Sequence, residues 1–153
     1  MHKFRGVSNL SLDAKGRIVL PARYRERLLE ICQGQLIVTI DTDQPCLLIY
    51  PLPEWEQIEE KIEALPAFNP ATRRIQRLLI GHATDVEVDG ATGRMLLSNP
   101  LREYARLGKK VVLIGQGKKF ELWDEETWSE RMDTWLNESG SSETPDALAE
   151  LTL

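Results

Sequence analysis

One segment decides the fold of this chain: Ala14-Lys15-Gly16-Arg17-Ile18-Val19-Leu20, which returns 77 residues later as Ala91-Thr92-Gly93-Arg94-Met95-Leu96-Leu97. The similarity continues beyond the motif. Each copy goes on to an Arg-Glu pair, two apolar runs separated by a turn, and a tryptophan. Because order and residue type agree across four consecutive elements, we interpret the chain as two copies of one plan.

The first motif predicts a β-hairpin with strands over 10–13 and 17–20. Gly16 is free to adopt a positive φ angle, and the carboxylate of Asp13 can accept hydrogen bonds from turn amides. A helix follows and ends before Gly34, since apolar residues recur at helical spacing and glycine is typical just past a helix end. Each half therefore is expected to form hairpin, helix, hairpin and helix.

Two further amphipathic helices are expected between the copies, over 54–65 and 69–81. Three arginines of the second one lie opposite its apolar side. They are Arg73, Arg74 and Arg77. A last helix begins at Asp124 and is expected to bury Trp128, Met132 and Trp135, which are spaced at i, i+4 and i+7. The segment 139–143 that follows is expected to be a flexible acidic tail.

Length and composition favour an ordinary soluble protein. The chain has 153 residues, of which 42% are hydrophobic and 28% charged. Apolar runs fall short of the roughly 18–20 residues that a membrane span needs, and the first residues lack a secretory signal, so we expect a cytoplasmic protein. Cys32 and Cys46 lack a Cys-x-x-Cys spacing and are expected to be reduced core residues without zinc.

Charge is distributed unevenly along the chain, whose net charge is −5. Residues 1–27 carry seven basic side chains against two acidic ones, a local charge of +5. Residues 137–153 carry four acidic side chains and no basic one, a local charge of −4. Opposite charge at the two ends can steer a polyanion to one face of an acidic protein.

The sequence offers no catalytic constellation. Its two histidines are His2, near the terminus, and His82, after a helix-ending glycine, and both are expected to be structural or solvated. The glycine-rich run 115–119 lacks the Gly-x-x-x-x-Gly-Lys-[Ser/Thr] spacing of a phosphate-binding loop and is expected to be a hairpin turn. We therefore expect no enzymatic activity, no cofactor and no metal.

The basic residues around the first motif point instead to duplex DNA. Lys15 lies in the turn and Arg17 begins the return strand. Arg5, Arg23 and Arg25 are close in sequence, and Arg94 repeats Arg17 in the second copy. A two-stranded ribbon fits the major groove, where arginine can donate two hydrogen bonds to guanine and neighbouring cations can bind phosphates. The alternatives are ordinary surface chemistry at a turn, an oligomeric scaffold for an acidic protein partner and, third, a phosphate-dependent enzyme.

The sequence resembles the MraZ family of bacterial transcriptional regulators, which contain two SpoVT-AbrB-type half-motifs. Five segments over nearly the full length carry the resemblance: Phe4-Arg5-Gly6, Leu12 to Arg17, Pro45 to Trp55, Arg73 to Ala83, and Lys119 to Trp123. The family motif falls on Asp13, Gly16 and Arg17 in the first copy and on Asp89, Gly93 and Arg94 in the second, with the aspartates and glycines shaping the turns. The second turn departs from the first, since three residues separate its aspartate and glycine instead of two.

The resemblance implies an α+β, mainly β fold: a swapped-hairpin double-split barrel of AbrB type, formed by both copies, with flanking helices. The implied divisions are a first repeat over 1–53, linking helices over 54–81, a second repeat over 82–126, and a C-terminal helix with an acidic tail over 127–153. It also implies a homo-oligomeric ring. Its partner would be double-stranded DNA with direct repeats upstream of its own cell-division and cell-wall operon, bound in the nucleoid by a regulator that is expected to repress.

Overall fold

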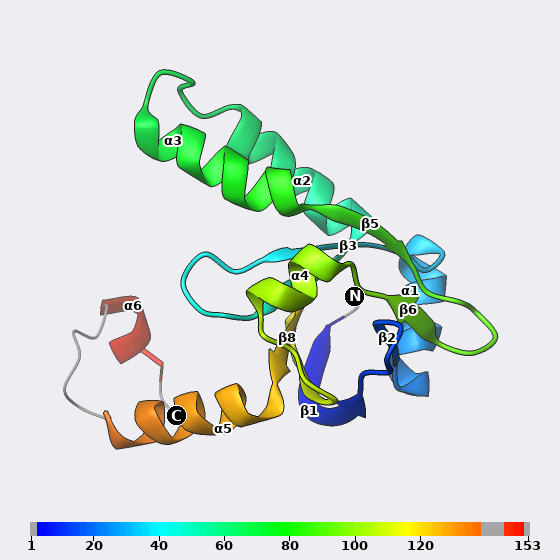
Figure 1. The fold of residues 1–153 in the computed structure, drawn as a ribbon. Helices are drawn as coiled ribbons and strands as arrows, with labels where there is room; N and C mark the ends of the chain where they lie inside the picture. The colour runs from blue at the N-terminus through cyan, green and yellow to red at the C-terminus, as the bar shows by residue number, and fades with distance from the viewer. Residues whose placement is uncertain (1–2, 139–145, 152–153) are drawn as a thin grey trace.

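The computed structural model describes residues 3–138 and 146–151. The first copy contains β1 (Phe4–Ser11), β2 (Arg17–Val19), α1 (Ala22–Cys32), β3 (Gln35–Ile40), β4 (Leu47–Pro51) and α2 (Leu52–Glu63). The second contains β5 (Thr84–Glu87), β6 (Arg94–Leu96), α4 (Asn99–Tyr104), β7 (Lys110–Gly117), β8 (Phe120–Asp124) and α5 (Glu125–Asn137). Both copies therefore have the same order of elements (Figure 1).

The helices and strands together form an α+β fold, in which the strands pair mainly in the antiparallel direction. One sheet has six strands in the order β1-β7-β8-β4-β3-β5, so β1 and β5 are its open edges. The second has two strands, β2 and β6. Apart from the hairpins β3–β4 and β7–β8, each ladder joins one copy to the other.

The prediction of a hairpin at 10–20 is wrong in its pairing. The chain does reverse at the first turn, but β1 leaves it to pair with β7, and β2 leaves it to pair with β6. The sequence pattern does not identify the partner strand, because inward and outward side chains alternate along a short strand in the same way for any antiparallel partner. The run 115–119, by contrast, forms the expected hairpin turn, in which the Gln116 amide donates to the Lys119 carbonyl oxygen over 2.9 Å.

The main core lies between the six-stranded sheet and the elements that cover it. Its centre is an aromatic cluster from β1, α1 and β8: the ring centroid of Phe120 is 4.4 Å from that of Phe4 and 5.0 Å from that of Tyr24. Cys46 is buried in a smaller cluster with Trp123, and Cys32 is half-buried on α1. Both cysteines are free thiols.

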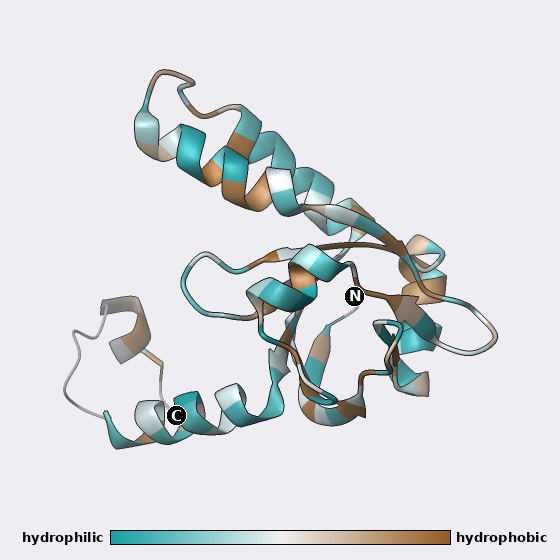
Figure 2. Cartoon of the chain, in the orientation of Figure 1, coloured by the Kyte–Doolittle hydropathy of each residue, from teal (hydrophilic) through white to brown (hydrophobic). Residues whose placement is uncertain are grey.

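Two helical segments extend away from the strands (Figure 1). We call α2, α3 (Pro70–Ile75), the π-helix η1 (Gln76–Ile80) and the loop 64–69 the helical arm. The α2 side chains Trp55 and Ile62 are buried, and the helix after η1 continues to His82, one residue beyond the expected end. Hydrophilic and hydrophobic residues alternate along the arm, whereas β3 is largely hydrophobic (Figure 2). Within the described residues, no helix has both the length and the apolar character to cross a bilayer.

The prediction for the last helix is wrong in part. Trp128 of α5 packs against Trp123, but Met132 and Trp135 keep 39% and 42% of their surface exposed. The Trp135 ring reaches back toward β8, with its centroid 5.8 Å from that of Trp123, but α5 as a whole extends away from the sheet (Figure 1), so its apolar side stays largely uncovered. A short helix, α6 (Asp146–Ala149), follows. The expected tail over 139–143 lies outside the described residues.

Candidate nucleic-acid interface

The first turn is closed by Asp13. Its Oδ1 atom accepts hydrogen bonds from the backbone amides of Lys15 and Arg17 over 3.0 and 2.8 Å, and its own amide donates to the Arg17 carbonyl oxygen. These bonds favour the ionised carboxylate. The Arg17 amide, together with the Arg17 guanidinium, therefore holds the pKa of Asp13 below its ordinary value of 3.8.

Gly16 fits this turn because of its conformation and its neighbours. Its φ angle is +88°, and a Cβ atom there would lie 2.9 Å from the Leu97 carbonyl oxygen and 2.8 Å from the Arg102 guanidinium. The Leu97 amide in turn donates to the Gly16 carbonyl oxygen over 2.8 Å. The first turn therefore packs on the second copy of the motif and is hydrogen-bonded to it.

The second turn is built against the first copy in the same way. Asp89 Oδ1 accepts hydrogen bonds from the amides of Ala91 and Thr92, which lowers the pKa of Asp89. Gly93 has a φ angle of +76°, and a Cβ atom there would lie 3.0 Å from both the Leu20 carbonyl oxygen and Arg25 Nη1. Arg25 and Arg102 are themselves 77 residues apart, so they are equivalent in the two copies.

The two turns differ in how they hold their arginine. Arg17 Nε donates to Asp13 Oδ2 over 2.7 Å, a contact that is both a hydrogen bond and an ion pair. In the longer second turn, the Arg94 backbone amide donates to Thr92 Oγ1. Among residues 3–138 and 146–151, the Arg94 guanidinium makes no hydrogen bond or ion pair, and the Nη atoms of Arg17 make none either.

The strands β2 and β6 join the two turns in one ribbon, which we call the β2–β6 ribbon (Figure 1). Arg17 lies opposite Leu96, and Val19 lies opposite Arg94. The central residues Ile18 and Met95 are buried, so by strand alternation the four flanking side chains point outward. The outward face therefore carries two arginines on one diagonal and two aliphatic residues on the other.

The structure distributes the other predicted cations over a wider area. Lys15 is exposed in the first turn, and Arg25 lies on the second. Arg5 is exposed on β1, and a rise of about 3.3 Å per residue places it about 20 Å from the end of β1 that meets the first turn. Arg23 uses its Nη2 atom to donate to Ser8 Oγ and Tyr24 Oη, both over 3.0 Å, so it also fastens α1 to β1.

Sequence reasoning missed two cations beside the first turn. Arg102 and Lys109 line a shallow pocket together with Asp13 and Ala14. Arg102 Nε donates to the Leu97 carbonyl oxygen over 3.0 Å, which fixes its position. The available signal for Arg102 was its alignment with Arg25. Lys109 gave no local signal, because β1 and β7 bring it to the turn: the Leu12 amide donates to its carbonyl oxygen.

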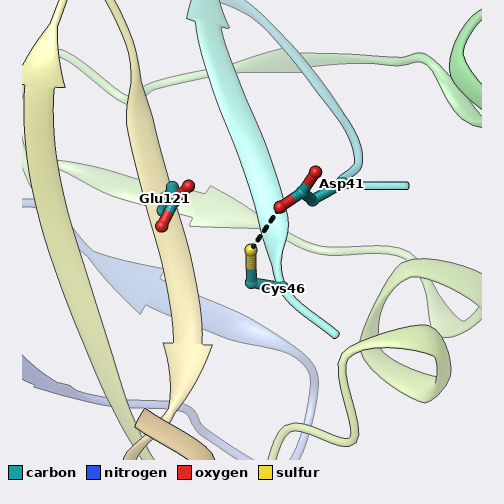
Figure 3. Close-up of side chains that lie close together, drawn as sticks. All are labelled: Asp41, Cys46 and Glu121. Carbon is teal, nitrogen blue, oxygen red and sulfur yellow. Dashed lines mark hydrogen bonds between the residues drawn. The ribbon is translucent and has the colours of Figure 1, made fainter. Parts of the chain in front are cut away.

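The groups best placed for a metal ion lie elsewhere, at Asp41, Cys46 and Glu121, whose ligand atoms are within 4.8 Å of one another (Figure 3). The Cys46 thiol donates to Asp41 Oδ2 over 3.5 Å, and Glu121 accepts from Trp123 Nε1. Burial, followed by the two carboxylates, raises the pKa of Cys46. In this arrangement the Cys46 thiol is the donor and the Asp41 carboxylate the acceptor of the hydrogen bond that joins them.

The described histidine, His82, is not part of this cluster. His82 Nδ1 donates to the Leu78 carbonyl oxygen over 2.8 Å, which ties the imidazole to its own helix. His2 lies outside the described residues.

Comparison with known proteins places the chain in a family. The family described as "MraZ protein, putative antitoxin-like" matches it twice, over residues 3–78 and 79–150. A protein of Alkalilimnicola ehrlichii named transcriptional regulator MraZ is 54% identical over 98% of this chain and 99% of its own length. Proteins of the same name from Coxiella burnetii and Yersinia pseudotuberculosis are 55% and 51% identical over the same shares.

Proposed function

Because the chain belongs to the MraZ family, whose curated relatives are named transcriptional regulators, we propose that it is a DNA-binding transcriptional regulator. Its target is duplex DNA with direct repeats upstream of its own cell-division and cell-wall operon, and it represses that operon in the cytoplasm, associated with the nucleoid. The observation that supports the proposal most is the β2–β6 ribbon, which presents Arg17 and Arg94 outward between two Asp-closed turns.

The ribbon enters the major groove, and Arg17 reads guanine. Asp13 holds the Nε atom of Arg17, which leaves the two Nη atoms for a base edge. Guanine offers the acceptors O6 and N7 to such a pair of donors, a contact worth about 1–3 kcal/mol of discrimination. Arg94 contacts the DNA from the other end of the ribbon with a side chain that has no such support.

The remaining cations bind phosphates and set the register of the protein on the duplex. Lys15, Arg102 and Lys109 do so beside the first turn, and Arg25 beside the second. Arg5 and Arg23, on β1 and α1, contact the backbone farther from the ribbon.

The exchange of strands between the copies supports the barrel that the family resemblance implies. Each turn delivers its two strands to the other copy, as a swapped hairpin does, here within one chain. In this arrangement the first repeat occupies 1–53, the linking helices 54–81, the second repeat 82–126 and the C-terminal region 127–153, so two of the boundaries fall just after the start of a helix, α2 and α5.

The protein assembles head to tail into a ring, through surfaces that the chain itself leaves uncovered. Phe68, at the tip of the arm, is 97% exposed, and α5 exposes Met132, Trp135 and Leu136. The helix α3 and η1 carry a net charge of +3, whereas α5 carries −3. Two different complementary surfaces on one molecule produce a ring when the rotation closes. Sedimentation at micromolar concentration should give an oligomer that Phe68→Ser dissociates.

A footprint on the DNA upstream of the protein's own gene tests the proposed function. We expect protection of repeated sites that random duplex DNA competes for poorly, with repeats about 10 base pairs apart. Arg17→Ala should weaken the footprint while the protein stays folded and oligomeric. Lys61→Ala, which removes one positive charge from the arm, should leave it unchanged. Equal binding to random DNA would contradict sequence-specific recognition, and failure to bind either duplex would favour the scaffold alternative.

A further inference from the structure

The β2–β6 ribbon exposes two aliphatic side chains that the fold does not use. Val19 is 50% exposed and Leu96 is 57% exposed. Their neighbours Ile18 and Met95 already fill the core side of the ribbon. Solvent-facing positions of an antiparallel pair are usually polar, so two outward aliphatic residues on a short ribbon indicate a contact surface.

The two aliphatic positions are equivalent in the two copies. Val19 and Leu96 are 77 residues apart, the offset that also relates Arg17 to Arg94. The register places an arginine directly opposite each of them. Directly opposed residues of an antiparallel pair have Cβ atoms about 4.5–5.5 Å apart, and diagonal neighbours lie about 7–8 Å apart. Each arginine therefore has an aliphatic side chain beside it at a distance comparable with one to two base-pair steps.

The major groove presents a matching pair of features. Guanine offers two acceptors to an arginine, and thymine offers its C5-methyl group to an apolar side chain. An arginine with an aliphatic neighbour can thus read a guanine and a nearby thymine together. Phosphate-binding cations beside both turns would hold the ribbon at the depth that such contacts need.

We propose that Val19 and Leu96 are specificity residues that recognise thymine methyl groups, next to the guanines read by Arg17 and Arg94. The inference rests on the proposed function, because it requires the β2–β6 ribbon to face the major groove. It adds an apolar component to recognition: the preferred duplex carries thymines beside the contacted guanines, and binding depends on their methyl groups.

The test compares the duplex footprinted upstream of the gene with the same duplex in which deoxyuridine replaces every thymidine, which removes only the methyl groups. We expect the unaltered protein to bind the deoxyuridine duplex about fourfold more weakly for each methyl contacted, the factor that corresponds to about 0.8 kcal/mol. The double variant Val19→Ala/Leu96→Ala should bind both duplexes equally and as weakly as the unaltered protein binds deoxyuridine DNA.

The control variant is Val7→Ala, which shortens a valine of similar exposure, 56%, on β1 outside the ribbon. It should keep the full preference for thymidine. Equal binding of both duplexes by the unaltered protein would overturn the inference, as would an unchanged preference in the double variant or its dissociation in sedimentation. Arg17→Ala on the thymidine duplex tests the proposed function separately, so either idea can fail while the other stands.

Discussion

The turns at Asp13–Arg17 and Asp89–Arg94 share one set of contacts, which we call the turn frame. They differ in whether the turn also holds the side chain of its arginine. In both, an aspartate accepts turn amides, a glycine adopts a positive φ angle, and an arginine from a helix of the other copy packs on that glycine. Only the first turn, among the described residues, also fixes the guanidinium of its own arginine. The turn frame thus serves the fold in both copies, whereas the Asp13–Arg17 contact is a feature of the first copy.

This difference indicates that the two copies contribute unequally to DNA recognition. A side chain that is already held loses less conformational entropy on binding than a free one. We therefore expect Arg17 to contribute more to recognition than Arg94, even though the two residues occupy equivalent positions in the β2–β6 ribbon. Four predictions test this comparison.

Substitution of either turn glycine should have the largest effect, a loss of stability, because it disturbs the turn frame that both copies share. Gly16→Ala and Gly93→Ala each force a left-handed conformation, which costs about 1–3 kcal/mol, and add a contact with the other copy. Gly117→Ala is the control for conformation alone, since its φ angle is +79° and its Cβ would have open space. Urea unfolding should rank both turn variants below Gly117→Ala, and a larger loss for Gly117→Ala would mean that the exchanged contacts contribute little.

Substitution of the arginines should separate the turns. We expect Arg17→Ala to weaken binding to the upstream duplex by about 5- to 150-fold, the range that corresponds to 1–3 kcal/mol, and Arg94→Ala to weaken it less. Fluorescence anisotropy at one salt concentration measures both. Equal losses would show that the Asp13 contact does not matter for affinity.

Substitution of the aspartates should show why the arginines differ. In Asp13→Asn the amide oxygen can still accept the turn amides, but Arg17 loses its charged partner. We expect the preference for the upstream duplex over random DNA to fall roughly two- to tenfold, the loss of about one hydrogen bond. Asp89→Asn removes the same charge from a turn whose arginine is not held, so it should leave the preference for the upstream duplex unchanged. A similar fall in the Asp89→Asn variant would refute the proposed difference between the turns.

Acidification should have the smallest effect. The pKa values of Asp13 and Asp89 are lowered by folding, so their contribution to stability is full above about pH 4 and is lost as pH falls through the folded values below 3.8. The difference in urea midpoint between the unaltered protein and Asp13→Asn should therefore narrow as pH falls from 5 to 2.5. A gap that keeps its full size from pH 5 to pH 2.5 would assign the effect of the substitution to something other than charge.

The order of the elements and the two turns could be predicted from sequence, because both depend on local signals that occur twice. Glycine and aspartate mark the turns, and apolar spacing marks the helices and strands. The partner of each strand could not be predicted in this way, since β2 has the same outward and inward residues whether it pairs with β1 or with β6. The resemblance to a family, not the pattern, indicated that the hairpins exchange.

The candidate site was predictable only where it is local. Lys15 and Arg17 lie at the first turn because the turn itself places them there. The exchange determines that Arg102 and Lys109 join them, while Arg23 uses its guanidinium to bond Ser8 and Tyr24. The burial expected for α5 failed for a related reason: helical spacing identifies an apolar side but not how far a sheet extends beneath it.

The pairing of β1 with β7 has a consequence for the synthesis of the chain. Phe4 pairs with Gly117, 113 residues further along, so the first strand made is completed by one of the last. At about 5–20 residues per second, the ribosome needs roughly 6–23 s to produce that partner. Throughout this interval the backbone of β1 is an unpaired template, which neighbouring nascent chains of the same sequence could occupy. The yield of native protein then depends on how long β1 stays unpaired, as well as on the stability of the finished fold.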